Sequence, residues 1–337
     1  MIRQRGFRDP KLYFVNEADG HYYFKQELIL PESGFTKDDN VIYCARRTAR
    51  IDAHRSLNAR AVATSRLAEQ LGIGDLVAKT EYATVVIDGE EKRGIRTAPI
   101  SGTTHVTMRW FNDLRGYRPY YTPEAVRELT ILVCFDFVCG QIDRHVKNIQ
   151  LKTDVDLQNV PPVAFGEGKI NILHVCAIDH DLSFGNLTYR QVRENVTAGL
   201  CTCPELLGEM QYPAVDMEFM QKVFSLEETT FKKDYADLLS DAEINAFFDR
   251  LEGFRTAVER QQEKEDALRT KGEAFFPRLL WKKEEYIEFL RRMEENAGQK
   301  NPDADFRFNN RPTYLLRDIL THKPYEGDTV AEEQKQE

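Results

Sequence analysis

Two polar residues near the middle of the chain, Asp143 and Asn148, lie five positions apart, and Asp179 follows an apolar stretch further on. A loop that carries an Asp, with an Asn at the start of the next strand, can present a carboxylate to a hydroxyl group and an amide oxygen to a magnesium ion. A second carboxylate beyond a neighbouring strand can complete the oxygen ligands, because magnesium prefers oxygen donors and keeps some of its waters. The spacing therefore predicts a phosphoryl-transfer centre, with Asn148 and Asp179 as metal ligands.

Lys25 is the candidate residue for contacting nucleotide phosphates. Residues 11–30 predict a β-hairpin, because aromatic and other strand-forming residues flank a turn-forming segment at Asn16–Gly20. A lysine in such a strand can equally be an exposed charge on the polar face. Its place early in the chain, ahead of a helix and well before Asp143, favours the phosphate-binding role.

The segments after this hairpin predict a small antiparallel sheet with one helix. Apolar spacing indicates a helix over residues 56–71, ended by Gly72. Two strands follow, over residues 81–87 and 93–100, and the Asp88-Gly89 pair between them is a strong hairpin-turn signal. Such a sheet and helix form a unit that can cover a nucleotide.

A mostly buried helix precedes the Asp143 loop. Residues 109–121 are interpreted as a loop, and Thr122-Pro123-Glu124 has the residue types of a helix N-terminus. The helix ends at Gly140. Two strands are then expected over residues 148–152 and 170–178, which would place Asn148 and Asp179 at the ends of neighbouring strands.

The rest of the chain predicts mainly helices. Ser240–Glu243 fits a capping box, and the apolar stripe that follows is typical of core packing. A second helix is expected over residues 283–297, with Gly298 as its stop. We therefore expect an α+β fold with an N-terminal sheet-plus-helix lobe (1–105), a mostly helical lobe carrying the catalytic loop (106–325) and a disordered tail (326–337).

The composition excludes some classes of function. The formal net charge of −9 argues against nucleic acid or an anionic membrane as the main partner. The polar N-terminal residues and the lack of long apolar runs predict a cytoplasmic protein with no membrane segment. Six cysteines in 337 residues favour reduced thiols, and Cys201 and Cys203 alone make a poor zinc site.

With these residues in place, the chain resembles the HipA-type serine/threonine kinases, and more loosely the type II phosphatidylinositol 4-kinases and the secretory-pathway kinases of the Golgi. The family's Gly-x-x-x-Pro-Lys segment is matched by Gly6–Lys11, and its strand lysine by Lys25. Its Asp-x-His-x-x-Asn catalytic loop is matched by Asp143–Asn148, and its metal-binding aspartate by Asp179. The likeness covers about residues 6–185.

The resemblance implies a protein-kinase-like fold and an ATP- and Mg²⁺-dependent kinase acting on protein Ser/Thr. It implies Asp143 as the base or orienting carboxylate, Asn148 and Asp179 as magnesium ligands, Lys25 on the ATP phosphates and His145 as a structural residue. The family also suggests pairing with a DNA-binding antitoxin, which no residue here specifies. The alternatives are a pseudokinase or nucleotide-binding module without transfer, and a lipid kinase of the phosphatidylinositol type.

Two positions depart from the family pattern or leave a choice open. Kinases of this kind place an acidic residue early in the first helix to pair with the strand lysine, but residues 58–67 contain no carboxylate, and Glu69 lies about two turns beyond. Asp181 competes with Asp179 as the metal ligand. We favour Asp179 because it directly follows the apolar strand.

Overall fold

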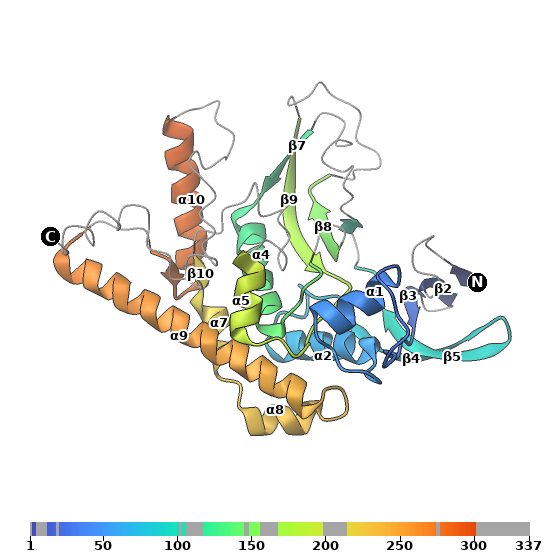
Figure 1. The fold of residues 1–337 in the computed structure, drawn as a ribbon. Helices are drawn as coiled ribbons and strands as arrows, with labels where there is room; N and C mark the ends of the chain where they lie inside the picture. Colours follow the sequence, from blue (N-terminus) through green and yellow to red (C-terminus); the bar gives the residue numbers. More distant parts are fainter. Residues whose placement is uncertain are drawn as a thin grey trace.

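The chain folds as a mixed α+β protein, in agreement with the class that its sequence predicts (Figure 1). The computed structural model describes residues 2–4, 12–17, 20–100, 103–105, 117–144, 148–155, 168–197, 214–273 and 277–300. The predicted tail, the Cys201–Cys203 pair and the whole Gly6–Lys11 segment lie outside these residues.

The first sheet has five antiparallel strands in the order β1-β2-β3-β5-β4. Their bounds are Ile2–Gln4, Leu12–Glu17 and Gly20–Gln26 for β1 to β3, and Thr80–Ile87 and Glu90–Thr97 for β4 and β5. Both predicted hairpins are confirmed. Asp88 and Gly89 have φ values of 52° and 81°, which a tight two-residue hairpin turn requires. The strand β1 is an addition that the sequence pattern does not indicate.

Strand β3 lies inside this sheet and carries Lys25, which pairs with Leu12 on one side and Ile95 on the other. The neighbouring strand approaches closely at Gly94. A Cβ atom there would lie 2.2 Å from the Lys25 carbonyl oxygen and 2.7 Å from the Phe24 ring. Glycine at this position therefore lets β5 pack directly against the backbone of Lys25.

The second sheet contains the two strands predicted over residues 148–152 and 170–178, and its order is β6-β8-β9-β7. β8 and β9 pair antiparallel and β7 joins β9 in parallel; the bounds are Thr103–His105, Tyr117–Tyr121, Ile149–Thr153 and Gly168–Ala177 for β6 to β9. The prediction of a loop over 109–121 is wrong for β7. Its tyrosines are good strand formers, and β9 supplies the pairing edge only in the folded chain. Residues 109–116 lie outside the described part.

Helix α4 (Pro123–Cys139) leads from this sheet into the Asp143 loop, and both its ends are as predicted. The Thr122 hydroxyl oxygen accepts a hydrogen bond from the Ala125 amide at 3.2 Å. Gly140 follows the helix with φ 66°, the left-handed conformation typical of a helix end. The chain therefore turns sharply where the loop begins.

The remaining described elements are mainly helices, α5 to α10. Their bounds are Tyr189–Thr197 (α5), Met217–Phe224 (α7), Glu228–Tyr235 (α8), Asp241–Lys271 (α9) and Lys283–Lys300 (α10), and a short parallel pair joins Val215–Asp216 (β10) to Leu279–Leu280 (β11). The predicted capping box at Ser240 and Glu243 is confirmed. The stop predicted at Gly298 is wrong, because α10 continues to Lys300. A glycine inside a helix costs only about 1 kcal/mol.

Helix α2 (Leu57–Gln70) is the predicted first helix, and Gly72 follows it with φ 74°. Its alanine-rich face belongs to the main core together with α4 and α9, whereas the first sheet has a small apolar cluster of its own. Arg60 of α2 is fully buried and forms an ion pair with Glu243, which is also fully buried, at the start of α9. This pair fixes α2 to the helical part of the molecule.

Candidate functional site

The Asp143 loop is held through its backbone, and one side chain links it to the loop after β9. The Asp143 amide donates to Gln141 Oε1 at 3.1 Å, and Gln141 Nε2 donates to the Asp179 carbonyl oxygen at 3.2 Å. The Asn148 Nδ2 group donates to the Asp143 carbonyl oxygen at 2.8 Å. Gln141 therefore holds the Asp143 loop and the loop after β9 in a fixed position relative to each other. His145, the predicted structural residue, lies outside the described residues.

Asn148 and Asp179 meet because their strands pair. In the β8–β9 register Ile149 is opposite Ala177, so the residues just outside these two are also neighbours. The Ile178 amide donates to the Asn148 carbonyl oxygen at 3.0 Å. The structure thus brings Asp143, Asn148 and Asp179 to one end of the hairpin.

Lys25 reaches the same place from the first sheet. Its Nζ lies 3.1 Å from Asp179 Oδ1 and 2.8 Å from Asp181 Oδ2. Glu69, the alternative from the sequence, instead lies 3.6 Å from Lys79 on the surface. Among the described residues, the carboxylates that contact the strand lysine are therefore the two that follow β9.

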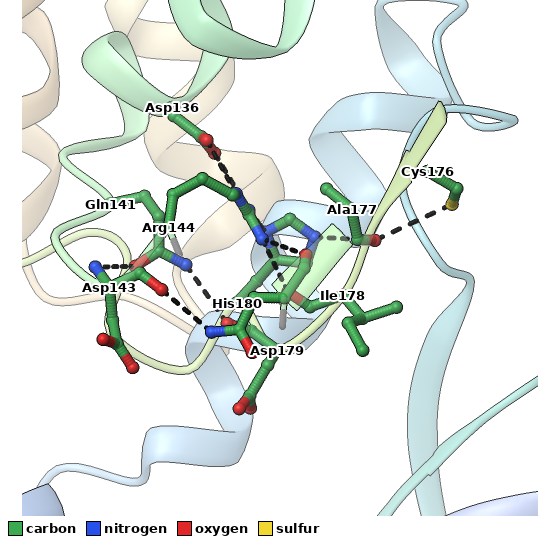
Figure 2. Close-up of polar contacts among 10 residues, drawn as sticks. Asp136, Gln141, Asp143, Arg144, Cys176, Ala177, Ile178, Asp179 and His180 are labelled. Atoms are coloured by element: carbon green, nitrogen blue, oxygen red, sulfur yellow. Dashed lines mark hydrogen bonds and ion pairs between the residues drawn. The ribbon is translucent and has the colours of Figure 1, made fainter. Parts of the chain in front are cut away.

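Arg144 is buried and holds together the segments that form the site (Figure 2). Its guanidinium donates two hydrogen bonds to the buried Asp136 carboxylate, at 2.8 and 3.0 Å. It also donates to the carbonyl oxygens of Asn148 and Ile178, at 2.9 and 2.7 Å. One planar group thus connects helix α4 with the ends of both β8 and β9. Figure 2 shows the carboxylates of Asp143 and Asp179 pointing away from the Asp136 contact.

His180, which lies between Asp179 and Asp181 in the sequence, is buried. Its contacts hold the imidazole ring in the neutral form. Its Nδ1 lies 2.9 Å from Arg144 Nη2, which can only donate, so Nδ1 is the acceptor. Its Nε2 lies 3.2 Å from the Ala177 carbonyl oxygen and carries the proton. Burial, and then the Arg144 charge, lower the His180 pKa to about 3. A second proton on this ring would face the guanidinium.

We expect His180 to stay neutral from pH 8 to pH 5. The unfolded chain takes up a proton near pH 6.5, whereas the folded chain does so only near pH 3, so this residue lowers the free energy of unfolding as pH falls through that interval. The measurement is a titration of the histidine Cε1–Hε1 shifts by NMR. His174 is the internal control, because its hydrogen bond to Glu128 raises its pKa and its signal should titrate. A His180 midpoint above pH 5 would contradict the assignment.

Asp179 and Asp181 differ in their surroundings, although both contact Lys25. The Asp179 side chain is 41% exposed and its backbone is left-handed, with φ 59°. The Lys25 charge lowers its pKa. The Asp181 side chain is only 8% exposed, and its burial raises its pKa to about 6 although Lys25 opposes this. Asp179 is the more accessible, more readily ionised carboxylate of the two.

The donor set fits magnesium better than a softer metal. Because Asn148 Nδ2 donates to the loop backbone, the amide oxygen is on the other side of the group and can act as a ligand, together with the Asp179 carboxylate. Within the described residues, no three His, Cys, Asp or Glu side chains cluster as a metal site. A centre with few protein ligands suits magnesium, which retains waters and binds substrate phosphates.

The sequence patterns did not identify two contributors to the site, which are Arg144 and the segment that contains Cys44. Arg144 has an indirect signal, because Asp136 interrupts the otherwise apolar segment Cys134–Cys139 and a buried carboxylate requires a partner. The segment that contains Cys44 had no such signal. It packs in an apolar cluster with Leu182 and Ile142, beside both loops, and the Asp143 charge helps burial to raise the Cys44 pKa.

No model of a known protein family and no curated protein matches this sequence. None of the helices in the described ranges combines the length and the apolar character needed to cross a bilayer.

Proposed function

We propose that this protein is an ATP- and Mg²⁺-dependent kinase that transfers the γ-phosphoryl group to a hydroxyl acceptor, with protein Ser/Thr as the acceptor class and a HipA-like arrangement. The observation that carries the proposal is the convergence of three separate segments: the Lys25 side chain contacts Asp179, and the Asn148 side chain binds the Asp143 backbone. Lys25 comes from β3, Asp143 and Asn148 come from the loop between α4 and β8, and Asp179 follows β9. This is the set that phosphoryl transfer requires, in the order along the chain that kinases use.

The surrounding elements support the same proposal. The sheet β1–β5 carries the lysine on one side, and the α4, β8 and β9 unit with its following helices carries the two loops on the other. We propose that these two parts are the lobes of a protein-kinase-like fold and that nucleotide binds between them. In this proposal, α2 corresponds to the kinase helix that normally supplies a carboxylate.

Each side chain has one task in the proposed reaction. Asp143 accepts a hydrogen bond from the acceptor hydroxyl and takes its proton as the new oxygen–phosphorus bond forms and the bond between the γ-phosphorus and the bridging oxygen breaks, releasing ADP. Lys25 contacts the phosphates in place of its present contact with Asp179. Asn148 and Asp179 would hold magnesium, which supplies positive charge against the phosphate oxygens.

The test is incubation of the purified chain with Mg-ATP, with and without a mixture of Ser/Thr peptides, followed by mass spectrometry of the products. A phosphoryl group on Ser or Thr, absent from a parallel Asp143→Asn sample, supports the proposal. Attachment of a nucleotidyl group would assign a different transfer chemistry. No transfer despite nucleotide binding would overturn it.

Asp179→Asn is expected to weaken Mg-ATP binding by roughly 10- to 100-fold, because a charged contact contributes about 1.5–3 kcal/mol. Binding of ATP in EDTA should change little. Titration calorimetry with and without magnesium measures both values. Asp154→Asn, at the far, exposed end of the same hairpin, is the matched control. Equal losses in both buffers would exclude Asp179 as a metal ligand.

One observation favours a second candidate, a nucleotide-binding module without transfer. Lys25 is engaged by two carboxylates at 3.1 and 2.8 Å, and no α2 carboxylate draws it away. In that case, the wild-type chain would bind Mg-ATP as tightly as Asp143→Asn does, and neither would form a phosphorylated product.

A further inference from the structure

Among the described residues, two carboxylates contact Lys25, and Asp179 is the better suited of the two to magnesium. Asp179 is exposed at 41% of its side chain, and it directly follows the residue that pairs with Asn148. Asp181 is buried and makes the shorter contact, 2.8 Å from Lys25 Nζ. If magnesium engages Asp179, Asp181 is the carboxylate that remains on the ammonium group.

The position of Asp181 is fixed from both sides. His180 before it is held by Arg144 and by the Ala177 carbonyl oxygen. Leu182 after it is buried in the apolar cluster formed with Leu30, Ala45, Ala49, Ile51 and Leu57. The carboxylate therefore lies on a short, doubly anchored turn, and it cannot move away without breaking one of these contacts.

The helix α2 acts on Lys25 through the backbone. Asn58 Nδ2 in its first turn donates to the Lys25 carbonyl oxygen at 3.0 Å, and its Oδ1 accepts from the Leu28 amide at 3.3 Å. Arg60, two residues further on, forms its ion pair with Glu243. The helix thus fixes the strand at Lys25, but the described contacts of the ammonium group to carboxylates all come from the loop after β9.

We propose that Asp181 is the positioning residue for Lys25. Asp181 takes the place of the carboxylate that residues 58–67 of α2 lack, and it keeps the ammonium group on the nucleotide phosphates while Asp179 binds magnesium. This inference rests on the proposed function. It assigns different tasks to two aspartates that are two positions apart: Asp179 binds the metal and Asp181 holds the lysine.

The two tasks predict different responses to magnesium. In Asp181→Asn, Lys25 retains Asp179 when no metal is present, so ATP binding in EDTA should change by less than about 3-fold, whereas Mg-ATP binding should weaken about 10-fold. Asp181→Glu should recover binding to within about 3-fold of wild type. In Lys25→Met the further change Asp181→Asn should add nothing, because the two residues act as one unit.

The experiment is fluorescence titration of the full chain with a labelled ATP analogue, in magnesium and in EDTA, for these variants, for Asp179→Asn and for the control Asp154→Asn. Thermal unfolding of each variant checks that it is folded, and Asp181→Glu provides the comparison if Asp181→Asn is not. Equal weakening in both buffers, or additive losses with Lys25→Met, would show a merely structural role and overturn the inference while the kinase proposal stands. Failure of the wild-type chain to bind Mg-ATP would overturn both.

Discussion

Replacing Asp143 by Asn is expected to lower the turnover number by about 10²–10⁴-fold, the range that a positioned general base contributes. The KM for ATP should stay within about 3-fold of wild type, because the nucleotide contacts belong to other side chains. Asn has the same shape as Asp, and the contacts that hold this loop use the Asp143 backbone N–H and carbonyl groups, so the loop should keep its geometry.

Steady-state initial rates over a series of ATP concentrations measure both quantities. Glu69→Gln is the matched control: it removes a carboxylate that contacts only Lys79 on the surface among the described ion pairs, and its rates should equal those of wild type. Wild-type turnover in Asp143→Asn would show that this carboxylate is not the base. A rise in the KM for ATP without loss of turnover would place it in nucleotide binding instead.

Arg144→Met is expected to lower the free energy of unfolding by about 3–5 kcal/mol, the usual cost of breaking a buried ion pair. Methionine fills much of the volume but leaves the buried Asp136 carboxylate without its cation. The carbonyl oxygens of Asn148 and Ile178 also lose a donor. If the variant still folds, the Asp143 loop and the loop after β9 should no longer be held in a fixed position relative to each other, and activity should be lost.

Urea unfolding followed by circular dichroism measures the change. Arg66→Met is the matched control, because Arg66 also forms a two-bond pair with a carboxylate, Asp237, but on the surface, where such pairs contribute about 0–1 kcal/mol. Adding Asp136→Leu to Arg144→Met should recover part of the loss, because the buried charge is then absent. A loss below 1 kcal/mol in Arg144→Met would mean that the pair is not a main support of the site.

Local signals in the sequence determined most of the helices, the hairpins and the positions of the candidate residues. Thr122 and Gly140 define α4 because capping and left-handed turn conformations depend on a few adjacent residues. Asp88-Gly89 defines the β4–β5 hairpin for the same reason. The pairing of β8 with β9 followed from two apolar segments, and it placed Asn148 beside Asp179.

The tertiary structure alone decided which partners these residues have. Lys25 and Asp181 are 156 positions apart in the sequence. No local pattern indicates that the lysine contacts this carboxylate instead of one from α2. The strand β7 likewise forms only because β9 supplies the edge with which it pairs. The hydrogen bonds of Arg144 depend on carbonyl groups that other segments supply. Propensity and capping act over a few neighbouring residues, whereas ion pairs of buried groups form between residues that the tertiary fold brings together from distant parts of the sequence. The sequence therefore determined which groups are present at the site, and the packing determined which of them face one another.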